Sequence, residues 1–304
     1  MGLPIERLAV LGLGLLGGSV ALAARERGVA REVVIATRSA AARARALAQG
    51  ALRAVEDPAD AVQGAQLVVL ATPVSAMEAT LARAASRLAA GAVVTDVGSV
   101  KGGPCERLQG LLPPGVDFVG SHPMAGSHER GPEHARADLF EGEFCIVASG
   151  ARSQASAQVR RFWEALGCRV VERDPAVHDA EVAWTSHVPH VLAFAFTAAL
   201  REAPAGAAEL VGPGFRDFTR IARSQPGLWG DILAANRKAL AGPLEEVRRA
   251  LAELSRAIEA EDSEAVERWI ARAQAPLLRL LQTDGAVEPA QRAGSKGARA
   301  THHD

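Results

Sequence analysis

Short apolar runs alternate with longer stretches of mixed apolar and polar residues through the first half of the chain. Runs such as Leu67–Ala71 are apolar at every position, which is typical of strands covered on both faces of a sheet. The stretches between the runs have the apolar spacing of helices. This alternation indicates βαβ units and a mainly parallel, doubly wound sheet. The expected strands are Leu8–Leu11, Val33–Thr37, Leu67–Ala71, Ala92–Val97, Val116–Gly120, Phe144–Ala148 and Arg169–Glu172, and the expected helices are Leu15–Arg27, Ala40–Gln49, Ser75–Leu88 and Cys105–Leu112.

The pattern changes after about residue 174, where the strand signals end and helical spacing continues. We therefore predict three parts: an α/β domain over residues 1–173, an all-α domain over residues 174–283, and a disordered tail over residues 284–304. The expected helical segments of the second domain are Val177–Leu200, Leu210–Arg223, Leu228–Leu240, Leu244–Ala260 and Ser263–Leu281.

Composition excludes several classes of function. The 304 residues carry 34 Lys and Arg against 35 Asp and Glu, so a nucleic acid or an anionic membrane is not expected as the main partner. With 48% hydrophobic and 23% charged residues, wholesale disorder is excluded. The three cysteines form no CxxC pair, which argues against a disulfide framework or a zinc ribbon and favours the cytoplasm. No apolar run is long enough to span a membrane.

A glycine-rich loop follows the first expected strand. The residues Gly12-Leu13-Gly14-Leu15-Leu16-Gly17 form a G-x-G-x-x-G pattern between a strand and a helix. Such a loop binds a pyrophosphate, because Gly12 allows a tight turn, Gly14 allows close approach of the ligand, and Gly17 allows helix and strand to pack. The pattern alone is also compatible with a simple glycine-rich turn. Its βαβ context favours a Rossmann dinucleotide-binding domain in which Leu15 and Leu16 open the helix at the phosphates.

The end of the second strand bears on the choice of dinucleotide. NAD sites usually place an acidic residue about 20 residues after the glycines, whereas Thr37, Arg38 and Ser39 stand there in this chain. A guanidinium pairs well with a 2′-phosphate, so we predict NADP as the preferred cofactor, with NAD possible. The alternative is that Arg38 is a solvated loop cation. We also expect Thr72 and Pro73, after the strand Leu67–Ala71, to contact the cofactor.

Two later loops supply candidate catalytic groups. His122 comes shortly after the expected strand Val116–Gly120, in a loop where Pro123 follows it. The ordinary pKa of a histidine, near 6.5, suits a proton acceptor at neutral pH. Ser99, in the loop after the strand Ala92–Val97, is a candidate partner that orients His122. The alternatives are a structural histidine and a helix N-cap serine.

The helical domain contains a second polar cluster. Ser186, His187 and His190 share one helix face, beside Pro189, whose place in a helix calls for a local explanation. We predict roles in substrate binding, with core histidines as the alternative. A metal site is not expected, since no nearby Glu completes a zinc motif.

Two arginines lie one turn apart on a helix further along the domain. Arg220 is flanked by Phe218 and Ile221, so we predict a buried arginine that binds a substrate carboxylate. For Arg216 a solvated face is the stronger alternative.

Together these motifs resemble the prephenate/arogenate dehydrogenase family of tyrosine biosynthesis. The resemblance implies a Rossmann domain followed by a helical substrate and dimerisation domain, a homodimer, and oxidative decarboxylation of prephenate to 4-hydroxyphenylpyruvate with hydride transfer to NAD(P)+. It implies that His122 takes the proton of the C4 hydroxyl and that Ser99 orients it. Substrate binding would then fall to His190, Arg220, Ser186, His187 and Ser127. The motifs that carry the resemblance are Gly12-x-Gly14-x-x-Gly17, Asp96-Val97-Gly98-Ser99-Val100-Lys101, His122-Pro123-Met124-Ala125-Gly126, Ser186-His187-Val188-Pro189-His190 and Gly214-Phe215-Arg216-Asp217-x-Thr219-Arg220-Ile221-Ala222.

Departures from the family pattern leave alternatives open. His128 follows Ser127 where many prephenate-specific members have Glu, which leaves the choice between prephenate and arogenate unsettled. We expect a monofunctional enzyme without an added regulatory or mutase domain. The other readings are an arogenate dehydrogenase that gives tyrosine directly, another two-domain NADP reductase, and a non-catalytic dinucleotide-binding regulator.

Overall fold

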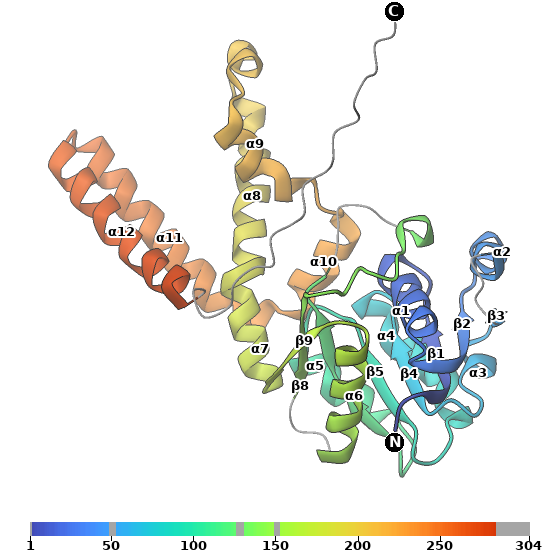
Figure 1. The fold of residues 1–304 in the computed structure, drawn as a ribbon. Helices are drawn as coiled ribbons and strands as arrows, with labels where there is room; N and C mark the ends of the chain where they lie inside the picture. The colour runs from blue at the N-terminus through green and yellow to red at the C-terminus, as the bar shows by residue number, and fades with distance from the viewer. Residues whose placement is uncertain (1, 49–52, 126–130, 149–152, 284–304) are drawn as a thin grey trace, which may run out of the picture. The chain divides into compact units, whose positions relative to one another are not determined.

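The computed structural model describes residues 2–48, 53–125, 131–148 and 153–283 (Figure 1). The chain divides into two compact units, Met1–Leu244 and Glu245–Asp304, and each is described by itself. The predicted tail after residue 283 lies outside the described residues, as does Ser127. No helix in the described ranges is both long enough and apolar enough to cross a membrane.

A six-stranded parallel sheet forms the centre of the first unit, in the order β3-β2-β1-β4-β5-β6. The order reverses between β1 and β4, so their loops separate there and leave the crevice in which open α/β sheets bind ligands. The apolar runs become strands because helices cover both faces, leaving residues such as Leu8 and Val68 fully buried. The strands are β1 (Ile5–Leu11), β2 (Ala30–Ala36), β3 (Arg53–Val55), β4 (Leu67–Leu70), β5 (Val93–Asp96) and β6 (Asp117–Val119).

The helices around this sheet follow the predicted alternation. The helix α1 begins at Leu15, directly after Gly14, and ends before Gly28, whose positive φ of 64° suits a chain reversal. The short α3 starts after Asp57, whose carboxylate accepts the backbone N–H of Ala59. The helices are α1 (Leu15–Glu26), α2 (Ala40–Ala48), α3 (Pro58–Ala61), α4 (Val74–Ala84) and α5 (Gly102–Gly110).

A second, three-stranded sheet was not expected from the sequence. It consists of β7 (Ser121–Pro123), β8 (Phe144–Ala148) and β9 (Arg169–Arg173), with β7 antiparallel to β8 and β8 parallel to β9. The helix α6 (Ser153–Ala165) contacts β8 and β9 and buries Phe162 and Trp163 completely. The prediction placed Phe144–Ala148 and Arg169–Glu172 among the strands without separating them into their own sheet. The elements β3, α3 and β7 were missed, because three- and four-residue segments carry almost no periodicity. The 13-residue helix α6 was also missed, although it is long enough to show a helical pattern.

The expected long helical segment near residue 180 is a continuous helix with one π turn. It comprises α7 (Pro175–Val182), the π turn Ala183–His187 and α8 (Val188–Ala199). The π turn ends at His187, two residues before Pro189, which cannot donate a backbone hydrogen bond, and this accounts for a proline at that place. The remaining segments are α9 (Pro213–Thr219), the 3-10 turn η6 (Arg220–Arg223) and α10 (Pro226–Ala235).

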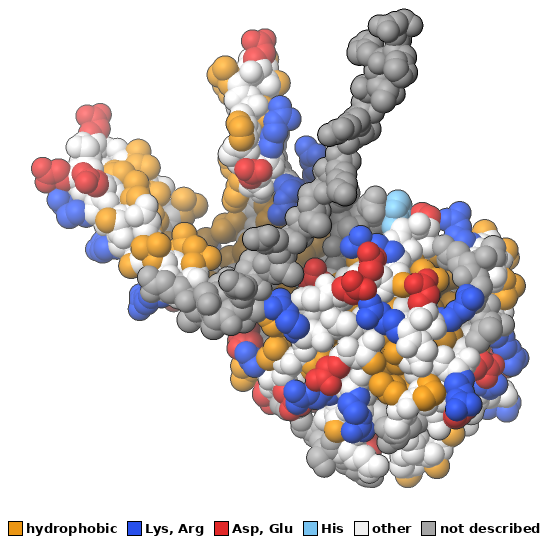
Figure 2. Space-filling view, in the orientation of Figure 1, with side chains coloured by type: hydrophobic (Ala, Val, Ile, Leu, Met, Phe, Trp, Pro, Cys, Tyr) orange, Lys and Arg blue, Asp and Glu red, His pale blue; other side chains and the backbone are white. Residues whose placement is uncertain are grey.

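The second unit is a helical pair. It holds most of α11 (Arg237–Glu259) and α12 (Ser263–Thr283), close to the predicted segments. Hydrophobic side chains gather along the surface of the pair (Figure 2). The exposed apolar residues there are Leu251, Ile258, Ile270, Leu277, Leu278, Leu280 and Leu281.

Candidate active site

The glycine loop between β1 and α1 has the form that a pyrophosphate requires. Gly12 has a φ of 112°, and a Cβ there would lie 2.6 Å from the carbonyl oxygen of Ala71. A Cβ on Gly17 would lie 2.2 Å from the carbonyl oxygen of Gly12. By contrast, a Cβ on Gly14 would meet no atom within 4 Å, so the loop is open at this position. Gly14 precedes α1 without a side-chain cap, which leaves the N–H groups of the first turn for a ligand.

The loop after β4 adds a buried polar atom to the same edge. Thr72 Oγ1 has no hydrogen-bond partner within the described residues although it is buried. Pro73 follows at the start of α4 and is exposed. Leu15 and Leu16 pack their side chains against the core under the glycine loop. Thr72 adjoins the glycine loop at Gly12, and an unsatisfied buried hydroxyl beside such a loop is an arrangement that a bound dinucleotide completes, so these residues fit the predicted cofactor.

The end of β2 presents an exposed cation. The Arg38 side chain is exposed, and no ion pair is formed by its guanidinium within residues 2–48, 53–125, 131–148 and 153–283. Ser39 Oγ accepts the backbone N–H of Ala42 at 3.2 Å, so its oxygen caps α2. The Thr37 and Arg38 carbonyls accept from Arg43, which is itself paired with Glu56. Arg43 therefore supports the loop, while Arg38 is available to a ligand.

A buried ion pair fixes the loop after β5. Asp96 and Lys101 are almost wholly buried and bonded to each other through Oδ2 and Nζ. Asp96 Oδ2 also accepts the N–H of Gly98 at 2.9 Å, and Oδ1 accepts the N–H of Ser121 at 2.9 Å. The carboxylate thus joins the loop after β5 to the first residue of β7, which places the next residue, His122. Trp163 Nε1 donates to Ser121 Oγ at 2.9 Å and secures the same point from α6.

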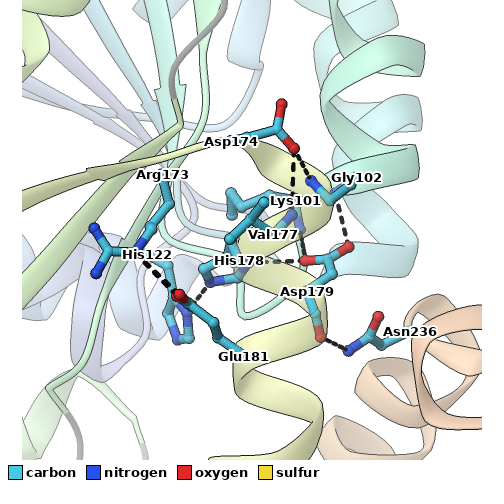
Figure 3. Close-up of polar contacts among 12 residues, drawn as sticks. Lys101, Gly102, His122, Arg173, Asp174, Val177, His178, Asp179, Glu181 and Asn236 are labelled. Atoms are coloured by element: carbon cyan, nitrogen blue, oxygen red, sulfur yellow. Dashed lines mark hydrogen bonds and ion pairs between the residues drawn. The ribbon is translucent and has the colours of Figure 1, made fainter. Parts of the chain in front are cut away.

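His122 is half-buried on β7 and contacts a second histidine rather than the predicted serine. Its Nδ1 lies 2.9 Å from Nε2 of His178, and the rings meet edge to face (Figure 3). Burial is the main cause that lowers the pKa of His122 well below 6.5, and the positive charge of Lys101 adds to the shift, so the ring is neutral at neutral pH. No hydrogen bond joins Ser99 to His122 in the described part of the chain.

Asp179 connects this histidine pair to the neighbouring elements. Its carboxylate accepts the N–H of Lys101 at 2.7 Å and of Gly102 at 2.8 Å, at the start of α5. Asp179 Oδ1 also lies 2.8 Å from His178 Nδ1. Burial raises the pKa of Asp179, but the bonds from His178 and the two backbone amides outweigh it, and the pKa is lowered. The Asp179 carbonyl accepts from Asn236 of the segment after α10 (Figure 3).

His187 is a core histidine by its contacts. It is 1% exposed, its Nδ1 accepts from Asn236 Nδ2 at 2.9 Å, and its ring meets Trp229 edge to face. Burial is the main cause that lowers the pKa of His187 to about 4, so it is neutral at pH 7. The structure thus favours the structural alternative for His187, which holds Trp229 in place.

His190 and Arg220, both predicted to bind substrate, lie near each other. His190 stacks on Trp229, and its Nδ1 donates to the Ser186 carbonyl at 2.8 Å. Partial burial is the main cause that lowers the pKa of His190, and the positive charge of Arg220 lowers it further. The hydrogen bond to the Ser186 carbonyl acts in the opposite direction and raises the pKa. Arg220 is close enough to act on His190, yet it is exposed. The prediction that Arg220 is buried is wrong for this chain: neighbouring Phe218 is itself 45% exposed, and its ring packs on Phe196.

The sequence reasoning missed His178 and Asp96 as members of the site. Asp96 and Lys101 were named only within a motif, and Asp179 lay only within the expected helix Val177–Leu200. An acid directly after a histidine at the start of a helix is a weak signal, and nothing in the chain's local pattern shows that it meets β7. Among the described residues, no group of three or more His, Cys, Asp or Glu is placed to hold a metal ion.

Comparison with family models agrees with this arrangement. The nucleotide-binding domain of prephenate dehydrogenase matches residues 20–172, and the dimerization domain of prephenate dehydrogenase matches residues 174–272. The chain belongs to the prephenate dehydrogenase family. The family predicted from the motifs is therefore confirmed, as is the α/β domain followed by a helical region.

Family members of known name cover almost the whole chain. The cyclohexadienyl dehydrogenase of Zymomonas mobilis is 34% identical over 93% of this chain and 99% of its own length. The prephenate dehydrogenase of Bacillus subtilis is 32% identical over 88% of this chain and 74% of its own length.

Solved structures of the family have the same fold. Prephenate dehydrogenase from Aquifex aeolicus, in complex with hydroxyphenyl propionate and NAD+, matches 92% of this chain and 100% of that chain with a TM-score of 0.83 and 27% identity. Arogenate dehydrogenase from Synechocystis matches 92% of this chain and 98% of that chain with a TM-score of 0.74 and 28% identity. Membership of this family and the glycine loop support an NAD-type dinucleotide as the cofactor.

Proposed function

We propose that the protein is a prephenate dehydrogenase, which converts prephenate to 4-hydroxyphenylpyruvate and carbon dioxide. The observation that carries the proposal is His122. His122 is neutral and half-buried, and it follows β6 at the carboxyl edge of the sheet. Its Nδ1 is held by His178, which leaves Nε2 for the substrate. A positioned neutral imidazole is suited to take a hydroxyl proton.

The reaction balances with one proton acceptor and one hydride acceptor. His122 takes the proton of the C4 hydroxyl as C4 gives up its hydride and becomes a carbonyl carbon. The bond between the ring and its carboxylate then breaks, carbon dioxide leaves, and the electron pair makes the ring aromatic. The proton returns from His122 to the oxygen, which becomes the phenol. A bound nicotinamide dinucleotide supplies the hydride acceptor.

Prephenate carries two carboxylates, so its site needs cationic or donor groups. We place Arg220 against a substrate carboxylate and His190 beside it. The proximity of the two is supported by the effect of the Arg220 charge on the pKa of His190. Ser186 holds His190 through its carbonyl, and His187 acts indirectly through Trp229. Ser127, proposed to bind substrate, lies outside the described residues, and Ser99 is proposed to contact the nicotinamide.

For the cofactor we propose NADP in preference to NAD. The support is the exposed Arg38 guanidinium at the end of β2 and the lack of an acidic residue at Thr37, Arg38 or Ser39. Ser39 can still donate its hydroxyl hydrogen while its oxygen caps α2.

We further propose a cytoplasmic homodimer. Its support is the match of residues 174–272 to a dimerization domain and the exposed apolar side chains of α11 and α12, which an isolated chain leaves in water. Light scattering after size-exclusion chromatography tests it: a mass near twice 31.7 kDa is expected, and a monomer contradicts it.

The experiment that tests the activity follows absorbance at 340 nm in four mixtures, prephenate or arogenate each with NADP or NAD. Reduction with prephenate and formation of 4-hydroxyphenylpyruvate is the expected result. Reduction with arogenate alone assigns the same residues to an arogenate dehydrogenase. No reduction, with the dinucleotide still bound, points to another reductase or to a regulator.

A further inference from the structure

Three side chains from two elements form a hydrogen-bonded row that ends at His122. Asp179 Oδ1 lies 2.8 Å from His178 Nδ1, and His178 Nε2 lies 2.9 Å from His122 Nδ1 (Figure 3). His178 is 0% exposed, and both of its ring nitrogens are engaged. We propose that His178 is a positioning residue that fixes His122 in the tautomer with hydrogen on Nδ1, leaving the Nε2 lone pair as the proton acceptor.

The direction of the hydrogen bonds follows from Asp179. An ionised carboxylate only accepts, and Asp179 already accepts two backbone amides at the start of α5. His178 Nδ1 therefore carries hydrogen and donates to it. In a neutral His178 the other nitrogen, Nε2, has only a lone pair, so the hydrogen between the two rings belongs to His122 Nδ1.

The proposed tautomer of His122 requires His178 to be neutral. The His178 ring is fully buried, and the buried ammonium of Lys101 in the same region is bonded to Asp96. The amides of Lys101 and Gly102 also satisfy part of the negative charge of Asp179. With a cationic His178 the bond would reverse, and hydrogen would sit on His122 Nε2, where no proton can be accepted.

The consequence is that catalysis depends on a residue that does not reach the substrate. In catalytic triads an acid orients a histidine that acts on a further group. Here Asp179 orients His178, and His178 in turn orients His122, the base. The spectroscopic test below reads proton positions in the free protein, so it does not depend on the proposed function. Only the activity test rests on the proposed function.

The first test reads the tautomer directly. Nitrogen-15 NMR of the full chain labelled at histidine distinguishes protonated from unprotonated ring nitrogens, and the His122 signals are assigned by their loss in His122→Asn. We expect a protonated Nδ1 and an unprotonated Nε2 at pH 7.5. A protonated Nε2 in the wild-type protein overturns the proposal, whatever the activity, and needs no variant that might misfold.

The second test compares two substitutions of His178. In His178→Asn the amide can still reach Asp179, as the ring Nδ1 does, but it leaves His122 Nδ1 without an acceptor. In His178→Gln the longer side chain can place Oε1 near the position of the ring Nε2, where it can accept from His122 Nδ1. We expect His178→Asn to lower kcat by about 10- to 100-fold, with the KM for substrate and the Kd for cofactor within about twofold. We expect His178→Gln to recover most of this loss.

Controls separate positioning from folding. His134→Asn removes an exposed histidine outside the row and is expected to leave kcat unchanged. Thermal unfolding monitors whether each variant is folded. Equal kcat loss in both His178 variants, or an unchanged His122 tautomer in His178→Asn, overturns the positioning role.

Discussion

The ring of His190 lies flat on the indole of Trp229, with ring centroids 3.5 Å apart and an interplanar angle of 20°. Trp229 is 9% exposed and comes from α10, while His190 comes from α8. The stack and the bond from His190 Nδ1 to the Ser186 carbonyl fix the ring at both its face and its edge. His190 is thus held in one orientation beside Arg220 before any substrate binds.

Loss of this stack is expected to weaken substrate binding. An aromatic pair contributes about 0.5–1.5 kcal/mol beyond its buried area, so Trp229→Leu should raise the KM for prephenate by about 2- to 10-fold. The kcat should change little, because His122 is not in contact with Trp229. Steady-state kinetics measures both, and Trp229→Phe, which keeps a ring, is the matched control. An unchanged KM in Trp229→Leu would remove His190 from the substrate site.

The base role of His122 predicts a selective loss of rate. His122→Asn should lower kcat by about 10²–10⁴-fold, the usual contribution of acid–base catalysis, and leave the cofactor Kd unchanged. The glycine loop and Thr72 do not depend on His122, so dinucleotide binding is the internal control. Fluorescence titration and initial rates give the two quantities. A kcat near that of the wild-type protein is incompatible with the proposed role.

Arg220 and Arg216 provide a pair of neighbouring exposed arginines. Arg220→Gln should raise the KM for prephenate by about 10- to 100-fold, since a charge-assisted bond to a carboxylate contributes about 1.5–3 kcal/mol. Arg216 bonds weakly to the Val211 carbonyl, and Arg216→Gln should leave the KM almost unchanged. Similar effects of both substitutions would show a general electrostatic attraction rather than a specific contact.

The cofactor preference is expected to follow the charge at Arg38. Arg38→Asp removes the partner of a 2′-phosphate and supplies an acceptor for a ribose hydroxyl, so the ratio of kcat/KM for NADP to that for NAD should fall at least tenfold. The control is Arg87→Asp, the same charge change at the end of the 3-10 turn after α4. If both variants keep the wild-type ratio, Arg38 is a solvated loop cation.

The buried pair of Asp96 and Lys101 predicts a large effect on stability. Lys101→Met leaves Asp96 buried without its cation and should lower the free energy of unfolding by about 3–5 kcal/mol. The double variant with Asp96→Asn should recover part of the loss, because no unpaired charge remains. Urea unfolding followed by circular dichroism measures both. A single variant within about 1 kcal/mol of the wild-type protein contradicts the assignment.

Local sequence patterns were enough for much of the first domain. Apolar runs such as Leu67–Leu70 and the glycines around Gly14 report their structure within a few residues, because burial on both faces and the turn geometry each leave a direct mark. His122 was predicted in the same way, from its place after a strand. The predicted boundary at residues 173 and 174 rests on such patterns too and remains a prediction.

What only the tertiary structure decided is which of these side chains meet. His122 and His178 are 56 positions apart, and Lys101 and Asp179 are 78 apart, so no local period connects them. The sequence suggested Ser99 as the partner of His122, but α7, which packs against α5, supplies His178 instead. The sequence also suggested a buried Arg220, but Arg220 is exposed beside the exposed Phe218. Periodicity records which face of an element is buried. The contacts that set proton positions arise between elements, and they depend on how those elements pack.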